Sequence, residues 1–162
     1  MATSRLAAAG STQGGLESAG VERAVCTGVA AMVNADTIFT ITGGPIQIVS
    51  LHSECITTHQ AVATTAQYQS VPTVGSATTI SGATTTLSGV AAGTTFRLAP
   101  TALSTAPVIS LAAAGGVQLG TNVANFINVN PGTLKLVIGT GGTGTWKHFL
   151  RYKPLCPDVQ VS

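Results

Sequence analysis

The sequence predicts an all-β fold, namely a β-sandwich, jelly roll or barrel of about eight to ten short strands. Three observations lead to this expectation. Short runs rich in Val, Ile, Thr and aromatic residues recur along the chain, Gly and Pro separate them, and no segment has the sustained periodicity of a long helix. With 162 residues, the chain is expected to form a single β domain over residues 21–162, preceded by a flexible N-terminal arm over residues 1–20.

Charge is unusually scarce in this chain. Charged residues make up 7% and aromatic residues 4% of the sequence, and the net charge is +2. An average soluble domain has about 25% charged residues. Because a surface so poor in charge is poorly protected against association, we expect neighbouring proteins to cover much of it.

The sequence allows two interpretations each for the N-terminal arm and for the segment that follows it. Residues 1–20 are small, polar and glycine-rich, which fits either a frayed terminus or an arm lying across a neighbouring subunit. The segment Val21–Val33 fits a helix by its valine spacing and a strand by its alternation. Gly28 weakens the helix, and Asn34 to Asp36 supply turn residues, so a strand and hairpin are predicted here.

The stretch from Asp36 to Thr58 carries the strongest strand signal. Two β-branched runs, 37–42 and 46–58, flank Gly43-Gly44-Pro45, which predicts two strands joined by a tight turn. Strict alternation places Ile46 and Ile48 on the face opposite Leu51 and Cys55. Because both faces are then partly apolar, the pair is expected to lie between two layers.

The later strands are read from alternation and from the turn residues between them. Weak alternation over 59–70 ends at Pro72, and the Thr-rich segment 73–99 predicts compact strands or, in its first part, a long loop. Further strands are predicted at the following positions: 94–98, 108–111, 117–119, 123–129 and 133–138.

The last strand, over residues 146–153, is the clearest amphipathic one. Its core face is predicted to carry Trp146, His148, Leu150 and Tyr152, and its other face Lys147, Phe149, Arg151 and Lys153. The three cations fit a basic stripe toward an acidic partner, but they also fit an edge strand whose charges discourage unwanted pairing, which we take as the default.

Few residues suggest catalysis or metal binding. His52, His59 and His148 with Glu54 and Cys55 are the only candidates, and their spacing matches no zinc signature. Structural histidines are therefore expected. Cys26, Cys55 and Cys156 do not form a disulfide framework and are expected to be reduced and mostly buried. A small enzyme using Cys55 with His52 or His59 stays open as an alternative, although no enzyme activity, catalytic residue, metal or cofactor is expected.

Several partner classes are not expected. The glycine-rich segment 139–144 lacks the lysine and the following helix of a phosphate-binding loop, so it is predicted to connect a hairpin. No basic run is long enough to follow a phosphate backbone, so no nucleic-acid partner is expected. No apolar stretch reaches the roughly 18 to 20 residues needed to span a bilayer, and residues 1–20 do not resemble a signal peptide, so no membrane partner is expected.

Two segments resemble a known group of proteins. The stretches NADTIFTITGGPIQIVSLHSECITT and GTGTWKHFLRYKPL, about a quarter of the chain, resemble small all-β virion structural proteins of tailed bacteriophages. Those proteins are similar in a glycine-glycine-proline turn between β-branched runs, a Thr-rich middle and an aromatic last strand ending in Pro-Leu.

The resemblance implies a capsid decoration or cement protein. It implies a homotrimer that binds the major capsid protein on the capsid exterior of a virion assembled in the host cytoplasm. The candidate interface residues are Arg5, Leu6, Lys147, Phe149, Arg151 and Lys153. A tail or neck component and a host-glycan-binding fibre module are the alternatives, the latter disfavoured because it needs exposed aromatic clusters.

Overall fold

A computed structural model describes residues 20–84, 86–98, 118–119, 127–139 and 144–162. The predicted arm with Arg5 and Leu6, the strand at 108–111 and the start of the strand at 123–129 lie outside these ranges. The described residues contain twelve strands and no helix, so the all-β prediction is confirmed, with more strands than expected. The strands are β1 (Arg23–Cys26), β2 (Ala30–Ala31), β3 (Asp36–Thr42), β4 (Ile46–Cys55), β5 (Ala66–Pro72), β6 (Thr78–Thr79), β7 (Thr95–Arg97), β8 (Gln118–Leu119), β9 (Ile127–Val129), β10 (Gly132–Ile138), β11 (Thr145–Pro154) and β12 (Gln160–Val161).

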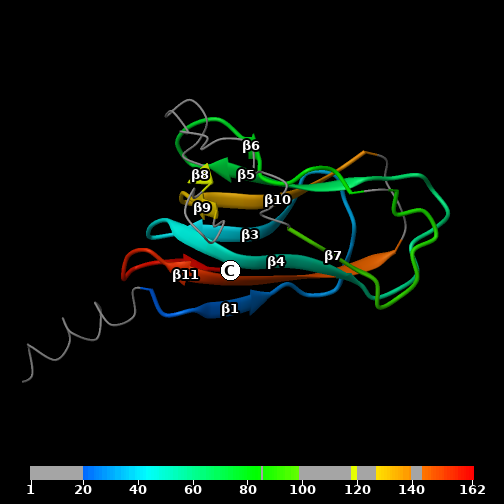
Figure 1. Ribbon diagram of the computed structural model, residues 1–162, viewed down its shortest axis with the longest axis horizontal. Coiled ribbons are helices and arrows are strands. Elements are labelled where there is room, and N and C mark those ends of the chain that lie inside the picture. The colour runs from blue at the N-terminus through cyan, green and yellow to red at the C-terminus, as the bar shows by residue number, and fades with distance from the viewer. Residues whose placement is uncertain (1–19, 85, 99–117, 120–126, 140–143) are drawn as a thin grey trace, which may run out of the picture.

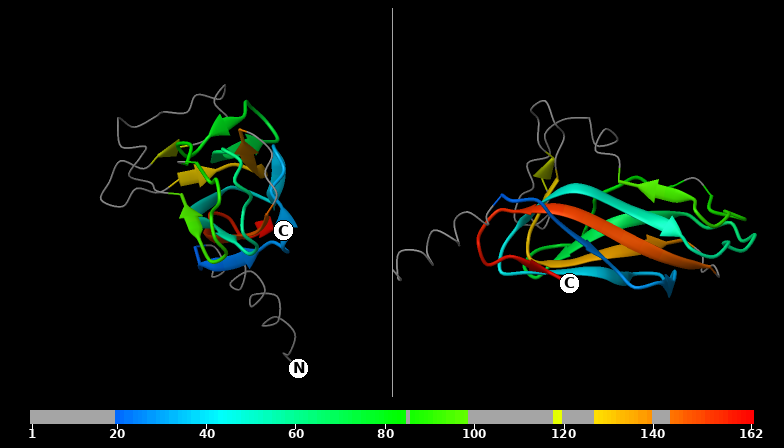
Figure 2. Two further views of the ribbon diagram at one scale, coloured as in Figure 1. Left: turned by 90° about the vertical axis from the view of Figure 1, so that its right-hand side faces the viewer. Right: turned by 90° about the horizontal axis from the view of Figure 1, so that it is seen from below.

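The strands form two antiparallel sheets that pack as a sandwich rather than closing into a barrel (Figure 1). Sheet A has seven strands in the order β1-β11-β4-β9-β8, with β2 also paired to β11 and β7 to β4. Sheet B has five strands in the order β12-β3-β10-β5-β6. The long strands run along the long axis of the molecule, and the end-on view of Figure 2 shows the two layers.

Most connections cross from one sheet to the other, which corrects three hairpin predictions. The turn at Gly43-Gly44-Pro45 joins β3 of sheet B to β4 of sheet A, and residues 139–144 join β10 of sheet B to β11 of sheet A. Strands β1 and β2 both pair with β11 instead of forming a hairpin with β3. Turn residues predict a reversal of the chain, but they do not determine whether the next strand joins the same sheet.

The prediction that the central strand pair lies between two layers is wrong, and a β-bulge in β4 explains why. Arg151 of β11 pairs with Ser50, and the next residue, Tyr152, pairs with Ile48, so Val49 is an extra residue in β4. An extra residue shifts the alternation by one position. Ile46 and Ile48 therefore face the core together with Leu51 and Cys55, and the other face of β4 carries half-buried polar side chains.

The corner between β3 and β4 is held by the C-terminal segment. Gly43 has φ 77°, and a Cβ atom at this position would lie 2.0 Å from the carbonyl oxygen of Asp158. The amide of Leu155 donates a hydrogen bond of 3.0 Å to the Pro45 oxygen. The two segments that carry the phage resemblance thus pack against each other, although about a hundred residues separate them.

The core lies between the sheets and follows the predicted alternation of the last strand. Trp146, Leu150 and Tyr152 are buried, and His148 is 8% exposed. Strand β10 alternates as predicted, with buried Leu134, Leu136 and Ile138. The largest fully buried side chains also include Tyr68, Phe39, Ile41, Ile46, Leu51, Ile80, Ile127 and His59.

Candidate interface

The outer face of sheet A brings together the candidate interface residues that the structure describes. On β11, Lys147, Phe149 and Lys153 are half-buried and Arg151 is exposed, and all four point away from the core. Their neighbours on β11 are the buried residues of the core face, so this arrangement follows directly from the alternation of the strand.

Strand β11 lies inside sheet A, with β1 and β2 on one side and β4 on the other. The prediction that its cations protect a sheet edge is therefore wrong. Charges on an interior strand have no edge to protect, so the other interpretation from the sequence, a basic stripe toward an acidic partner, remains as a prediction.

A row of side chains crosses four strands on this face. Cys26 of β1 pairs with Phe149 of β11, Phe149 with His52 of β4, and His52 with Arg97 of β7. The rings of His52 and Phe149 are stacked, with centroids 4.8 Å apart and planes inclined by 8°. Stacked planar rings present a flat surface with little side-chain freedom to lose on binding.

Cations surround the stacked pair. The Nζ atom of Lys147 lies 5.4 Å from the centroid of the Phe149 ring. Arg151 donates a hydrogen bond of 2.6 Å from Nε to Oε1 of Glu22 and forms an ion pair with the same carboxylate. Arg97 is exposed at the other end of the row, and Glu54 pairs in register with Lys147. Cations therefore outnumber carboxylates around the aromatic pair, which suits an acidic partner surface.

The sequence did not indicate His52 and Arg97 as parts of this surface. Alternation places each of them on an outward face, but it does not show that β4 and β7 both lie in the sheet that holds β11. A strand pattern identifies which side chains share a face of one strand, whereas the neighbouring strand is fixed by contacts distant in sequence.

The histidines and cysteines proposed for a metal site or a catalytic pair are dispersed. His52 points outward, whereas Cys55 is fully buried, and burial raises the pKa of its thiol, an effect that the nearby His59 amide partly offsets. Within the described ranges no three His, Cys, Asp or Glu side chains come close enough to hold a metal ion. Cys156 is partly buried, but Cys26 is exposed, so the prediction of mostly buried cysteines fails at Cys26.

A polar network inside the core joins the two sheets. The hydroxyl of Ser53 lies 2.7 Å from the Tyr68 hydroxyl and 2.6 Å from Nδ1 of His148. Tyr68 belongs to sheet B, whereas Ser53 and His148 belong to sheet A. Burial raises the pKa of Tyr68 and lowers that of His148 to about 4, against a smaller opposing effect of the Asp36 carboxylate. The network is closed to solvent, so its role is structural.

The other buried histidine differs from the satisfied structural residue that was expected. His59 is fully buried, yet neither ring nitrogen has a hydrogen-bond partner in the part of the chain that the structure describes. Its ring meets Trp146 edge-on, with centroids 6.0 Å apart. The prediction of a satisfied histidine is confirmed for His148 and wrong for His59.

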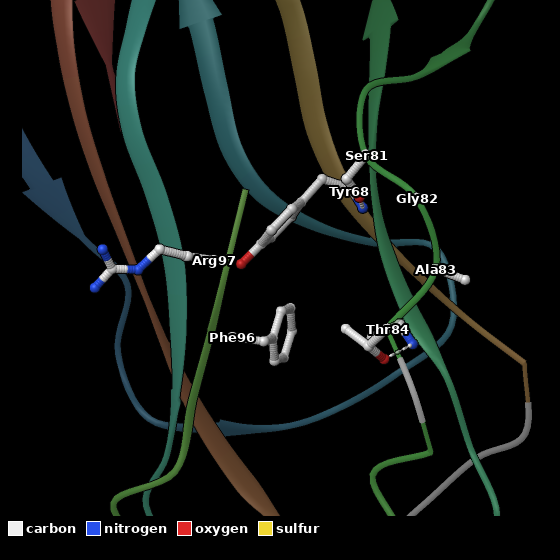
Figure 3. A pocket seen from close by; sticks show the side chains of 8 residues that line it. Tyr68, Ser81, Gly82, Ala83, Thr84, Phe96 and Arg97 are labelled. Atoms are coloured by element: carbon white, nitrogen blue, oxygen red, sulfur yellow. Dashed lines mark hydrogen bonds between the residues drawn. The ribbon is translucent and has the colours of Figure 1, made fainter. Parts of the chain in front are cut away.

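A cavity of about 210 Å³ lies between the two sheets beside this core (Figure 3). The rings of Tyr68 and Phe96 line it, with the segment Ser81–Thr84 across from them. The guanidinium of Arg97 points away from both rings. The hydroxyls of Ser81 and Thr84 accept hydrogen bonds from the Tyr68 and Ala66 amides. The walls of the cavity are therefore mostly apolar, and its two hydroxyl groups already accept hydrogen bonds from the backbone of β5.

Comparison of the chain with family models, with curated proteins and with solved structures finds no match. The resemblance to phage virion proteins thus depends on the two segments named above. Among the described residues there is no helix of the length and apolarity that crossing a bilayer demands.

Proposed function

We propose that this protein is a structural, non-enzymatic virion component of a tailed bacteriophage that decorates and stabilises the capsid exterior. It binds several copies of the major capsid protein at once and acts as a homotrimer. The observation that carries the proposal is the outer face of sheet A, where a chain with only 7% charged residues gathers Lys147, Arg151, Arg97 and Lys153 around a stacked aromatic pair.

Multivalency explains how such a surface would stabilise a capsid. A single flat contact with a few exposed charges is expected to bind weakly, because exposed ion pairs contribute about 0 to 1 kcal/mol each. When three copies are held together, binding of the first copy raises the effective concentration of the other two at the capsid surface. The avidity of the trimer therefore exceeds the affinity of a single copy. Such a trimer ties capsid subunits together and raises the free energy needed to separate them.

The test uses capsids assembled without this protein, mixed with wild type or with Lys147→Glu. If each contact loses about 1 kcal/mol, affinity falls about fivefold per contact, and more steeply for the trimer. Cosedimentation measures the binding, and capsid survival on heating measures the stabilisation. Lys135→Glu is the matched control, since Lys135 lies on β10 of sheet B and the charge change is identical.

The outcomes separate the alternatives. Equal binding by the two variants would show that another surface meets the capsid. If wild type ignores capsids but cofractionates with tails, the tail or neck role replaces decoration. Binding to host glycans would support the fibre module, although Trp146 and Tyr152 are buried and offer no sugar-stacking platform.

A further inference from the structure

One edge of sheet A is formed by β1 and β2. Both strands pair with β11 on one side, and no described strand pairs with them on the other. The amide of Thr27 donates a hydrogen bond of 2.9 Å to the His148 oxygen. Because hydrogen-bonding direction alternates along an antiparallel strand, Ala24 and Cys26 direct their amides and carbonyls toward the free side.

Between Ala24 and Val33 the described edge has none of the usual protection against pairing, and the one charged residue of β1, Arg23, donates a hydrogen bond from Nη1 to the Val159 oxygen. The sequence Ala24–Val33, AVCTGVAAMV, contains no charged residue and no proline. Val21, Val29 and Val33 are 55%, 54% and 56% exposed along it. Soluble proteins normally place lysine, proline or a bulge on an edge of this kind. Here the lysines of sheet A lie on its interior strand β11 instead.

We propose that a second copy of this chain covers the edge, with β1 of each copy paired antiparallel across a two-fold axis so that sheet A continues from one copy into the next. Identical edges fit each other in this geometry, because antiparallel residue pairs exchange both of their hydrogen bonds. The outward residues Ala24 and Cys26 are small, so the two strands meet without a steric clash. The absence of charge from Ala24 to Val33 removes the repulsion that usually separates identical edges.

The chemistry of the edge selects this occupant over a charged one. An acidic or basic partner segment would find no opposite charge between Ala24 and Val33, and the two flanking charges are already engaged, Glu22 with Arg151 and Arg23 with the Val159 oxygen. A two-fold contact uses the backbone edge of β1, whereas the proposed capsid contact uses the outward side chains of β11, β4 and β7. It therefore adds to a three-fold assembly by linking neighbouring trimers, and it exists in the free protein whether or not the capsid role holds.

The experiment is sedimentation velocity of the free protein over a range of concentrations, with Val29→Lys and Val74→Lys as a matched pair. Val29 lies on the edge, whereas Val74 is 83% exposed in the segment between β5 and β6, away from it. Wild type and Val74→Lys are expected to associate equally. Val29→Lys should raise the dissociation constant of that step about tenfold or more, because it places a charge on an otherwise uncharged edge, which is how soluble proteins prevent edge pairing. Ala24→Lys provides a second edge variant should Val29→Lys fold poorly, as judged by circular dichroism.

Hydrogen exchange locates the contact. The amides of Ala24 and Cys26 are expected to exchange more slowly as wild-type concentration rises, and to lose this dependence in the edge variants. Association that is equal in all variants, exchange at these amides that is independent of concentration, or a wild type that does not self-associate would each overturn the proposal. Because no capsid is present, failure here is distinguishable from failure of the decoration role.

Discussion

His148 is held neutral by the core around it. Its ring is 8% exposed, its Nδ1 atom lies 2.6 Å from the Ser53 hydroxyl, and burial lowers its pKa to about 4. The Asp36 carboxylate acts in the opposite direction but does not outweigh the burial. A histidine in such a site makes the stability of the fold depend on pH.

The protein should lose stability as the pH falls from about 6.5 to about 4. In this window the unfolded chain binds a proton at position 148 and the folded protein does not, so protons favour unfolding. The stability is complete above pH 6.5, and the loss approaches about 3 kcal/mol near pH 4. Urea titrations at several pH values measure it, with His148→Gln as the control. If the unfolding free energy of that variant falls equally steeply between pH 6.5 and pH 4, groups other than His148 cause the pH dependence.

Ser53 is expected to contribute more to the free energy of unfolding than a small side chain usually does. Replacing it by alanine leaves the Tyr68 hydroxyl and the His148 ring without the partner that both share, at a cost of about 2 to 4 kcal/mol in unfolding free energy. Ser50→Ala is the matched control on the outer side of the same strand, expected within about 0.5 kcal/mol of wild type. Similar urea midpoints for both variants would show that the network adds little.

At the scale of single residues, the sequence predicted which face of β11 is buried, and the structure confirms the prediction from Trp146 to Tyr152. The partners of those residues were not predictable. Ser53 and His148 are 95 positions apart, and no local pattern distinguishes a serine that meets a histidine from one that meets solvent. The stack of His52 on Phe149 was missed for the same reason.

At the scale of elements, the positions of the long strands could be predicted, but their pairing could not. Alternation correctly placed the later strands from 94–98 onward wherever the structure describes them, including half-buried β10. It failed at β4, where the extra residue Val49 reverses the pattern and brings two apparently opposite apolar faces to the same core. A bulge is selected by packing against the partner strand, so the sequence of one strand alone does not reveal it.

The corner at Gly43 tests how tightly β3 and β4 are tied to the C-terminal segment. Gly43→Ala should destabilise the protein by more than about 2 kcal/mol, because it adds an atom 2.0 Å from the Asp158 oxygen to the strain of a positive φ. Gly89→Ala separates the two effects, since Gly89 has φ 68° with open space around it and should lose about 1 kcal/mol. Thermal unfolding measures both. Equal losses of stability in the two variants would mean that the backbone around Asp158 moves aside at Gly43 without a cost in free energy.

At the scale of the whole molecule, the charged and the apolar exposed residues lie on two different surfaces of the folded protein, although both surfaces are built from segments distant in sequence. The outer face of sheet A is cationic and aromatic, whereas the edge from Ala24 to Val33 is uncharged and mostly apolar. The composition predicted that neighbours would cover this protein, but only the sheet order separates these two surfaces. Each suits a different partner, and Lys147→Glu and Val29→Lys are expected to impair them independently.

The pairing of β1 with β11 also bears on how quickly the chain can fold. Arg23 lies opposite Tyr152, so β1 cannot join sheet A until residue 152 has left the ribosome. Most connections cross between the sheets, and loop closure over such distances opposes early structure, which places all-β proteins of this kind in the range of milliseconds to seconds. During synthesis the uncharged residues Ala24 to Cys26 therefore stay unpaired until the partner strand β11 has been made, and chaperones can bind them during this interval.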